Sequence, residues 1–331
     1  MEYYAIKNPV GSIIRFIIAC NETNKLERKT MILEWFEHQS PGLGSTYRES
    51  VFNKYDTLLN FEIEIIDQIF IELGWQTFIV KPLFEEKYEL LKQNGLVENR
   101  DQRVTLSELG KYLYEQQIYN HYIESIAFKA NFWKLNNVKI TDNNSMGSGS
   151  FISKNEIITC KHVIDELEGN DILIEDESSK VYTIKSIKRP VNENVDLIII
   201  ETEEDFEFFP YKIEEKTNLV EKVIIFGYPP IPLTTKPFLI ANLGEVSAEV
   251  DNYIDRTDCL ILSSITRPGN SGGPVLNEFG KLIGIMSQNR QHQLTFTWDN
   301  MNDFDVNKGL GYAAALKSKY VIELQSQPTN N

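Results

Sequence analysis

The pattern of apolar residues changes near residue 140, and this change constrains the fold more than any other feature of the chain. In the earlier part, apolar residues recur at spacings of three and four residues, which is the period of an amphipathic helix. The pattern predicts helices at Lys25–His38, Phe61–Leu73 and Phe84–Asn94. We therefore expect the first part of the chain to be mainly helical.

After residue 140, short β-rich runs separated by turn residues recur, which is typical of a β-sandwich or a β-barrel. The segment Asn136–Ser150, rich in Asn, Ser and Gly, lies between the two patterns and marks a domain boundary. We therefore expect an α+β chain of two domains, a helical one over residues 1–140 and an all-β one over residues 141–331. The expected strands are Asp171–Glu175, Val181–Lys188, Leu197–Thr202, Val223–Tyr228, Cys259–Ser263 and Lys281–Met286.

Composition narrows the class of protein. Of the 331 residues, 42% are apolar and 24% are charged, which is enough to bury a core. Lys and Arg number 33 against 48 Asp and Glu, and the net charge of −15 argues against nucleic-acid binding through a basic surface. The apolar stretches are too short to span a bilayer, and Ser12–Cys20, interrupted by Arg15, lacks the features of a secretory signal. We therefore expect no membrane and no nucleic-acid partner.

The chain has three cysteines, Cys20, Cys160 and Cys259, and none of them lies in a pair with metal-ligand spacing. An odd number of cysteines leaves one over in any disulfide pattern, so the chain has no disulfide framework of the secreted kind. Together with the lack of a signal sequence, this predicts a cytoplasmic protein.

The strongest chemical signal is the sequence GNSGGP at Gly269–Pro274. Glycines beside a serine allow a tight turn and let a substrate carbonyl approach the backbone closely. Ser271 is therefore a candidate nucleophile, and the backbone N–H groups of Gly269 and Ser271 are candidates for binding a developing oxyanion. The alternative interpretation is a hairpin turn that happens to contain a serine.

A serine needs a neighbouring base to act as a nucleophile. Of the four histidines, His162 follows a β-type run, whereas His38, His121 and His292 have no comparable context. Asp196 begins the apolar run DLIIIET, where a carboxylate beside a buried strand is costly without a partner. These two residues are candidates for the base and for the carboxylate that orients it. A solvated histidine and a turn aspartate are the alternatives.

In the order His162, Asp196, Ser271, the chain resembles the trypsin-like serine peptidases of the chymotrypsin fold, and among them the HtrA/DegP type. The segments that carry the resemblance cover about residues 145–322 in the expected order. They are GSGSFISKNEIITCKHVI, VDLIIIE, EKVIIFGYP, LGEVSAEV, SSITRPGNSGGPVLNEFGKLIGI and GLGYAAALKS. The resemblance implies a double β-barrel, in which His162 and Asp196 come from the first barrel and Ser271 from the second.

The resemblance also implies an activity, that of a serine endopeptidase acting on proteins or peptides. Ser271 would attack the peptide bond, His162 would move the proton and Asp196 would hold the imidazole tautomer. This chemistry needs no cofactor and no metal. PDZ domains, which many relatives carry, are not expected, because the chain ends soon after the resemblance. Asn270 stands where pancreatic-type enzymes have an aspartate that pairs with a new N-terminus. Control by the N-terminal domain or by the ordering of loops is therefore expected.

The same resemblance locates a specificity pocket. No acid lies at the expected floor of this pocket, so the prediction is a small or aliphatic residue before the scissile bond rather than Arg or Lys. The floor is expected at Ile265, and the walls at Ile285, Met286, Ser287, Gly311 and Ala313.

The insertion Gln288–Lys308 is long for a loop in a compact domain, and such loops often form lids. Asp303, Asp305 and Asn307 alternate like the start of a calcium loop, but the glycine is one position late and no glutamate closes the loop. A solvated or substrate-contacting loop is therefore favoured over a metal site.

The stretch Leu90–Leu113 resembles the helix, hairpin and following helix of a winged-helix module. Gly95 is expected to end the first helix, and Glu108 takes the capping-box position of a helix that starts from Thr105. The helix before Gly95 is rich in acidic residues, which are poorly suited to phosphates. A regulatory or interaction domain, acting through a partner or through self-association, is therefore favoured over a DNA-binding domain.

Two alternatives to an ordinary serine endopeptidase stay open. One is a catalytically silent, protease-like module whose cleft only binds peptides. The presence of all three triad residues and of the glycines around Ser271 argues against it. The other is a protease that its winged helix targets to DNA, and a salt-dependent shift with duplex DNA, abolished by deletion of residues 1–140, would identify it.

Overall fold

The computed structural model describes residues 8–22, 25–39, 44–55, 77–100, 103–142, 145–167, 172–232, 234, 236–252, 256–265, 267–287 and 312–327. The predicted helix Phe61–Leu73 and the insertion Gln288–Lys308 lie outside these residues. The chain divides into two compact units, Met1–Ser125 and Ile126–Asn331. In the described part of the chain, no helix is both long and apolar enough to cross a membrane.

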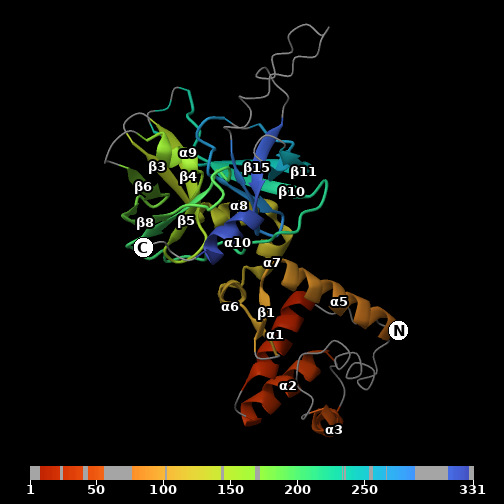
Figure 1. Cartoon of the computed structure of the whole chain (residues 1–331). Coiled ribbons are helices and arrows are strands. Elements are labelled where there is room, and N and C mark those ends of the chain that lie inside the picture. The colour runs from red at the N-terminus through yellow and green to blue at the C-terminus, as the bar shows by residue number, and fades with distance from the viewer. Residues whose placement is uncertain are drawn as a thin grey trace, which may run out of the picture. The chain divides into compact units, whose positions relative to one another are not determined.

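The first unit consists mainly of helices, as its sequence pattern predicts (Figure 1). The predicted helix Lys25–His38 is observed as α2, and Phe84–Asn94 corresponds to the second half of α5. The run Ser12–Cys20 lies in α1. The elements of this unit are α1 (Pro9–Asn21), α2 (Lys25–Gln39), α3 (Ser45–Tyr55), α5 (Thr77–Gln93), β1 (Val97–Arg100), β2 (Arg103–Leu106), α6 (Glu108–Glu115) and α7 (Tyr119–Glu124).

Local chemistry explains where α1 begins and how it packs. Asn8 caps the helix, because its side-chain oxygen accepts a hydrogen bond from the N–H of Gly11 at 3.0 Å. Trp35 of α2 is buried, and its indole N–H donates to the carbonyl oxygen of Ser12 at 2.9 Å. The ring of Phe16 packs on Trp35 with the ring centroids 4.5 Å apart. These contacts hold α1 against α2.

The helix, hairpin and helix predicted for Leu90–Leu113 are present in that order as the end of α5, β1, β2 and α6. Gly95 has a φ of 70°, the left-handed conformation that often ends a helix. Ser107, rather than Thr105, caps α6, because its Oγ accepts from the N–H of Gly110 at 3.0 Å while Thr105 is part of β2. The predicted start of this helix is therefore corrected toward the C-terminus, and the winged-helix function stays a prediction.

The second unit begins with α8 (Ile126–Trp133) and η1 (Lys134–Asn136) and continues into an antiparallel sheet with the strand order β7-β6-β3-β4-β5-β9-β8. The short helix α9 (Lys161–Asp165) follows β5. The strands are β3 (Asn137–Thr141), β4 (Met146–Phe151), β5 (Glu156–Thr159), β6 (Leu173–Asp176), β7 (Val181–Tyr182), β8 (Ile184–Lys188) and β9 (Ile198–Thr202).

The other strands of this unit close into a barrel with the order β10-β11-β12-β15-β14-β13, and α10 (Lys319–Ser326) follows it (Figure 1). Each strand predicted from the sequence overlaps an observed strand, Val181–Lys188 as the pair β7 and β8. The two sheets form the chymotrypsin-like double β-barrel that the sequence predicts. The strands of the closed barrel are β10 (Lys222–Gly227), β11 (Ile240–Asn252), β12 (Thr257–Leu262), β13 (Pro274–Asn277), β14 (Leu282–Met286) and β15 (Ala313–Lys317).

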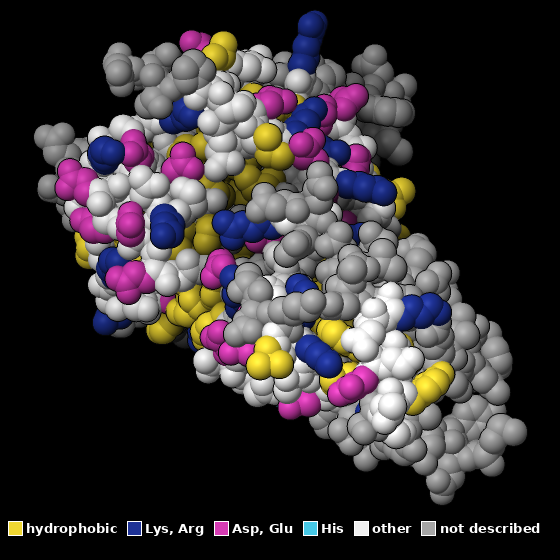
Figure 2. Space-filling model, turned by 90° about the horizontal axis from the view of Figure 1, so that it is seen from below, with side chains coloured by type: hydrophobic (Ala, Val, Ile, Leu, Met, Phe, Trp, Pro, Cys, Tyr) yellow, Lys and Arg dark blue, Asp and Glu magenta, His cyan; other side chains and the backbone are white. Residues whose placement is uncertain are grey.

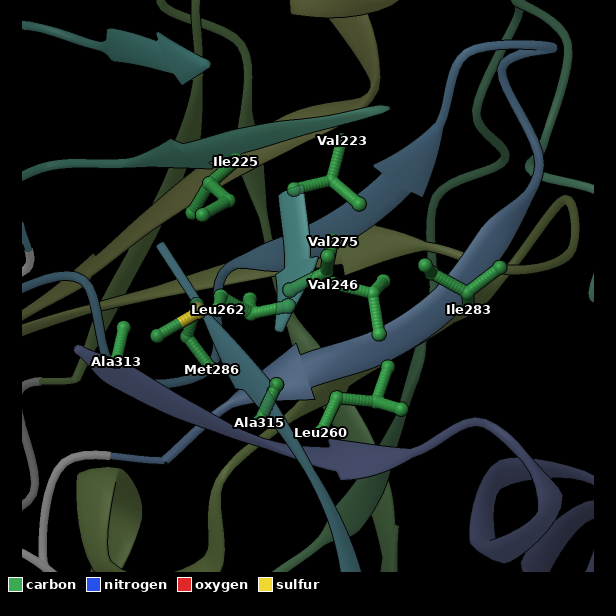
Figure 3. Close-up of a cluster of buried hydrophobic side chains, with 10 residues drawn as sticks. All are labelled: Val223, Ile225, Val246, Leu260, Leu262, Val275, Ile283, Met286, Ala313 and Ala315. Atoms are coloured by element: carbon green, nitrogen blue, oxygen red, sulfur yellow. The ribbon is translucent and has the colours of Figure 1, made fainter. Parts of the chain in front are cut away.

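The closed barrel is filled by a cluster of apolar side chains, each at most 1% exposed, which Figure 3 shows pointing toward one another between the strands. Burial of each large apolar side chain contributes about 1.5–3 kcal/mol, so this cluster is a main source of the barrel's stability. Its members are Val223, Ile225, Val246, Leu260, Leu262, Val275, Ile283, Met286, Ala313 and Ala315.

The sequence pattern places the domain boundary at residue 140, whereas the structure divides between Ser125 and Ile126. β3 pairs with both β4 and β6, so residues 137–141 belong to the first barrel. The helix α8 also belongs to the second unit, because Trp133 packs on Tyr211 with ring centroids 5.2 Å apart. A short helix at the start of the peptidase-like unit therefore continues the helical pattern past the end of the first unit.

Candidate active site

Strand pairing brings His162 and Asp196 together. β5 and β9 are antiparallel neighbours, with Thr159 opposite Ile198. His162 lies in α9 shortly after the end of β5, and Asp196 lies just before the start of β9. Because the end of β5 faces the start of β9, the two side chains meet at the same edge of the sheet.

The Asp196 carboxylate takes part in three hydrogen bonds. Its Oδ1 accepts from the backbone N–H of His162 at 3.0 Å, and its Oδ2 lies 2.7 Å from Nδ1 of the same residue. Oδ2 also accepts from Oγ of Ser287 at 2.9 Å. Of the two side chains, 13% of His162 and 16% of Asp196 are exposed. An ionised carboxylate can only accept a hydrogen bond, so the ring proton is assigned to Nδ1. Nε2 is then the basic atom of the ring.

The hydrogen bonds also determine the charge of Asp196. Burial by itself would raise the pKa of this carboxyl group, because burial penalises the charged form. The hydrogen bonds and charge of His162, with the hydrogen bond from Ser287, outweigh burial and hold the pKa of Asp196 below its usual value. Asp196 is therefore ionised at neutral pH and able to orient the imidazole.

Ser271 lies in the turn between β12 and β13 and is 6% exposed. The glycines on either side of it have positive φ angles, 92° at Gly269 and 81° at Gly272. A Cβ at Gly272 would overlap the carbonyl oxygen of Ser148 and Oγ1 of Thr159. The turn therefore requires glycine for its backbone conformation and for its close approach to β4 and β5.

Most polar groups of this turn are hydrogen-bonded within the backbone. The N–H of Asn270 donates to the carbonyl oxygen of Arg267 at 3.0 Å, and the carbonyl oxygen of Asn270 accepts from Gly273 at 2.9 Å. Among the residues that the structure describes, the N–H groups of Gly269 and Ser271 make no hydrogen bond. These are the two donors that the sequence predicts for an oxyanion.

Ser271 approaches the strand that leads to His162 through the backbone. Its carbonyl oxygen accepts from the N–H of Ser148 in β4 at 2.9 Å, and β4 pairs with β5. Within the described ranges, no hydrogen bond joins Oγ of Ser271 to the His162 ring. Catalytic hydrogen bonds are often long without substrate and shorten only in the complex, so this geometry is compatible with a serine–histidine pair.

The residues predicted to form the specificity pocket differ widely in how much of each side chain is exposed. Ile265 is 72% exposed, which does not fit the floor of an enclosed pocket. Ile285 is fully buried, and Met286 and Ala313 belong to the apolar cluster of the closed barrel (Figure 3). The side chains of these three residues are not exposed in this structure, and their role as pocket walls stays a prediction. Gly311 lies outside the described residues.

Ser287 contacts Asp196 instead of lining a pocket. It follows directly after β14, whose last residue is Met286, and it is 1% exposed. Successive side chains of an extended chain point to opposite sides, so Met286 enters the barrel core while Ser287 faces the carboxylate. Sequence analysis missed this role, and no local motif marks it, because the partner of Ser287 is far away in the sequence.

Cys160, His162 and Asp196 are potential metal ligands, since their ligand atoms lie within 4.8 Å of one another. Each of them is already hydrogen-bonded in the protein. The thiol of Cys160 is buried and donates to the carbonyl oxygen of Met286 at 3.1 Å, and His162 is bonded to Asp196. These hydrogen bonds account for the arrangement of the group. Asp303, Asp305 and Asn307, which alternate like the start of a calcium loop, lie outside the described residues.

The sequence has relatives among known proteins. Residues 147–285, which include His162, Asp196 and Ser271, match the family model described as trypsin-like peptidase domain. The uncharacterized protein y4bJ of Sinorhizobium fredii (strain NBRC 101917 / NGR234) is 30% identical over 144 residues, which is 43% of this chain and 22% of that protein. The chain thus spans about a fifth of the length of this curated relative.

Solved structures of proteases are also similar to this chain. The serine endoprotease from Yersinia pestis is 20% identical, with a TM-score of 0.46 over 61% of this chain and 65% of that chain. The Rv3671c protease of M. tuberculosis H37Rv, in an inactive form, is 17% identical, with a TM-score of 0.45 over 61% of this chain and 93% of that chain. By the family match, residues 147–285 of this chain, which lie in the double β-barrel described above, are similar to a trypsin-like peptidase domain.

Proposed function

We propose that the chain is a serine endopeptidase with Ser271, His162 and Asp196 as its catalytic triad. The observation that carries this proposal is that the carboxylate of Asp196 is hydrogen-bonded to both the backbone N–H and the Nδ1 atom of His162. With Nδ1 engaged in this way, Nε2 is left to take a proton from Ser271. The match of residues 147–285 to the trypsin-like peptidase domain supports the same reaction class.

In the proposed reaction, Oγ of Ser271 attacks the carbonyl carbon of the scissile peptide bond while its proton passes to Nε2 of His162. The carbonyl oxygen becomes an oxyanion, which accepts hydrogen bonds from the N–H groups of Gly269 and Ser271. Each such donor contributes about 10²–10³ in rate. His162 gives its proton to the leaving amine, and the acyl group stays on Ser271. Water then attacks the ester while His162 takes a proton from this water. His162 passes that proton to Oγ of Ser271 as the acyl–Oγ bond breaks, which releases the acid product and regenerates Ser271.

We propose a protein or peptide substrate with a small or aliphatic residue before the scissile bond. Ile265 lies six residues before Ser271, and its 72% exposure makes it available to contact a bound side chain. An apolar contact favours apolar side chains over Arg and Lys. Digestion of a peptide library followed by mass spectrometry tests this preference. Cleavage confined to bonds after Arg or Lys would contradict it.

The experiment that tests the activity is labelling of the full chain with a fluorophosphonate probe, which reacts with activated serines. We expect the wild type to be labelled and Ser271→Ala to be unlabelled. Ser264→Ala, which removes another buried serine hydroxyl preceding the same turn, is the matched control and should be labelled like the wild type. Labelling that persists in Ser271→Ala would place the reactive serine elsewhere.

A catalytically silent peptide-binding module is a second candidate function. The observation in its favour is that, in the described part of the chain, Ser271 and the His162 ring share no hydrogen bond. This candidate predicts no labelling and no cleavage, together with peptide affinity that survives Ser271→Ala. Fluorescence anisotropy with a labelled peptide library separates it from the endopeptidase.

We also propose that the first unit regulates the peptidase, through a ligand, a partner or self-association. This unit contains a cavity of about 400 Å³, which is the size of many small-molecule sites. Met31→Trp would occupy part of the cavity, and a changed rate of Ser271 labelling would support the coupling, whereas an unchanged rate would count against it. The cavity is lined by Arg15, Ile18, Met31, Glu34, Trp35 and Tyr114.

Targeting to DNA finds less support than regulation. Figure 2 shows acidic and basic side chains interspersed over the described part of one face of the molecule. The net charge of the chain is −15. Phosphate contacts require a concentrated basic surface, so we do not extend the proposed function to DNA.

A further inference from the structure

Ser148 of β4 is buried, with 1% of it exposed, and its groups contact both sides of the turn that carries Ser271. Its N–H donates to the carbonyl oxygen of Ser271 at 2.9 Å, and its Oγ donates to the carbonyl oxygen of Gly269 at 2.6 Å. One residue of the first barrel therefore holds the carbonyl groups on both sides of Asn270, in the second barrel's nucleophile turn.

Two further hydrogen bonds fix Ser148 itself. Its Oγ accepts from the N–H of Tyr228 at 2.9 Å, and its carbonyl oxygen accepts from Oγ1 of Thr159 at 2.7 Å. Thr159 is the last residue of β5, the strand that leads to His162. Ser148 is thus hydrogen-bonded both to the last residue of the strand that leads to the base and to the nucleophile turn.

The hydrogen bonds of Ser148 restrict rotation in the turn. Peptide groups are planar, so each carbonyl group shares its plane with the N–H of the next residue. Ser148 therefore holds the peptide groups that carry the N–H of Asn270 and of Gly272, and the peptide group that carries the N–H of Ser271 lies between these two. The carbonyl groups of Gly269 and Ser271 point at Ser148, and Asn270 uses its own N–H and carbonyl group within the turn. The N–H groups of Gly269 and Ser271 are the donors that stay available, among the described residues, for an oxyanion.

We propose that Ser148 is a positioning residue, whose hydroxyl group fixes the peptide group between Gly269 and Asn270 and so holds the nucleophile turn in the conformation that leaves the N–H groups of Gly269 and Ser271 available to an oxyanion. The role matters for the reaction only if Ser271 is the nucleophile, so this inference rests on the proposed function. Without the hydroxyl, the carbonyl oxygen of Gly269 and the N–H of Tyr228 lose their shared partner in a buried site. A buried carbonyl or N–H group without a hydrogen-bond partner is costly, so these two groups tend to rotate toward another partner.

The chain offers a matched control in the same strand. Ser150 is fully buried, but its Oγ has no hydrogen-bond partner among the described residues. Each of the variants Ser148→Ala and Ser150→Ala therefore removes one buried hydroxyl group from β4. Only Ser148→Ala also removes hydrogen bonds to the turn. A difference between the two variants reports on those hydrogen bonds and not on the loss of packing in the strand.

The experiment measures two properties of the full chain in both variants. The first is the second-order rate of labelling by a fluorophosphonate, for which we expect Ser148→Ala to be slower than Ser150→Ala by about 10- to 100-fold, as for the loss of a hydrogen bond to a buried group. The second is amide hydrogen exchange of residues 267–273, which we expect to be faster in Ser148→Ala. If Ser148→Ala fails to fold, Ser148→Cys keeps the volume and replaces the hydroxyl by a weaker donor, with the same expected direction.

The outcomes separate this inference from the proposed function. Equal labelling rates and equal exchange in Ser148→Ala and Ser150→Ala would overturn the positioning role while the endopeptidase stands. A wild type that is never labelled would count against the endopeptidase, and the exchange of residues 267–273 would still decide whether Ser148 holds the turn. Slow labelling with fast exchange confined to that turn supports the proposal.

Discussion

Ser287 donates a hydrogen bond from its Oγ to Oδ2 of Asp196 at 2.9 Å, although the two residues are 91 positions apart in the chain. Ser287 follows a strand of the closed barrel, whereas Asp196 precedes β9 of the other sheet. The same carboxylate oxygen contacts Nδ1 of His162. The orientation of the proposed base therefore depends on a contact between the two barrels.

Replacement of Ser287 by alanine should slow the reaction more than it destabilises the fold. Asp196 would lose one of its hydrogen bonds and hold the imidazole less firmly, which corresponds to about 1 kcal/mol or roughly a fivefold lower rate. The measurement is the rate of fluorophosphonate labelling of Ser287→Ala and of the wild type at the same pH. Equal rates would show that the carboxylate is oriented without Ser287.

Ser318 provides the control for this substitution. It is also fully buried, and its Oγ donates to the carbonyl oxygen of Glu214 at 2.7 Å, away from the triad. Ser318→Ala should therefore lower the melting temperature to a similar extent as Ser287→Ala and leave the labelling rate near that of the wild type. A reduced rate in both variants would indicate a general loss of stability.

Replacement of Asp196 by asparagine should lower the labelling rate by about 10⁴-fold, because an amide can donate to Nδ1 and so favours the wrong tautomer. Asp165→Asn is the matched control: Asp165 lies in the same helix as His162, and its carboxylate pairs with Arg189 at 2.9 Å on the exposed surface. This control should react like the wild type. An Asp196→Asn variant of undiminished rate would remove Asp196 from the proposed triad.

The three triad candidates could be found from the sequence because each lies in a segment with a local pattern. Ser271 lies between glycines that a tight turn requires, and Asp196 begins an apolar run that becomes a buried strand. The short β-rich runs separated by turn residues in the second half also predict the strands. Such signals are local, because turns and strands depend mainly on neighbouring residues.

The contacts around the proposed triad could not be found in this way. Ser148 and Ser287 meet their partners through pairings between distant strands, and a lone serine has no sequence pattern that reports such a contact. The predicted pocket walls show the same limit. Ile285, Met286 and Ser287 are consecutive, and an extended chain directs consecutive side chains to opposite sides, so the sequence alone does not show which of them faces a substrate.

The stability of the second unit should depend on pH through Lys129 of α8, which is 3% exposed. Burial lowers the pKa of Lys129 to about 8, and the nearby charge of Glu278 opposes this shift. In the unfolded chain the pKa is about 10.4. Between about pH 8 and pH 10.4 the unfolded chain therefore binds more protons at this position than the folded chain does, and the contribution of Lys129 to stability rises with pH. Below about pH 8, Lys129 is charged in the folded chain as well, so burial of this charge lowers the free energy of unfolding by its full amount.

The measurement is the free energy of unfolding by urea, for the wild type and for Lys129→Met, from pH 7 to pH 10. We expect the wild type to gain stability relative to Lys129→Met over this range, by up to about 3 kcal/mol. The comparison of two chains removes the contribution of other groups that titrate in the same range. Profiles that run parallel would contradict the lowered pKa of Lys129.

Replacement of Gly272 by alanine should disrupt the turn that carries Ser271. Gly272 has a φ of 81°, a conformation that costs an L-residue about 1–2 kcal/mol, and its new Cβ would overlap Ser148 and Thr159. Both strands would have to move, so we expect a fall in melting temperature of several degrees or more and the loss of Ser271 labelling. Gly44→Ala is the control, because a Cβ at Gly44 meets no atom within 4 Å. If Gly272→Ala were as stable and as reactive as Gly44→Ala, the close approach of the nucleophile turn to β4 and β5 would be wrong, and with it the geometry on which the role of Ser148 depends.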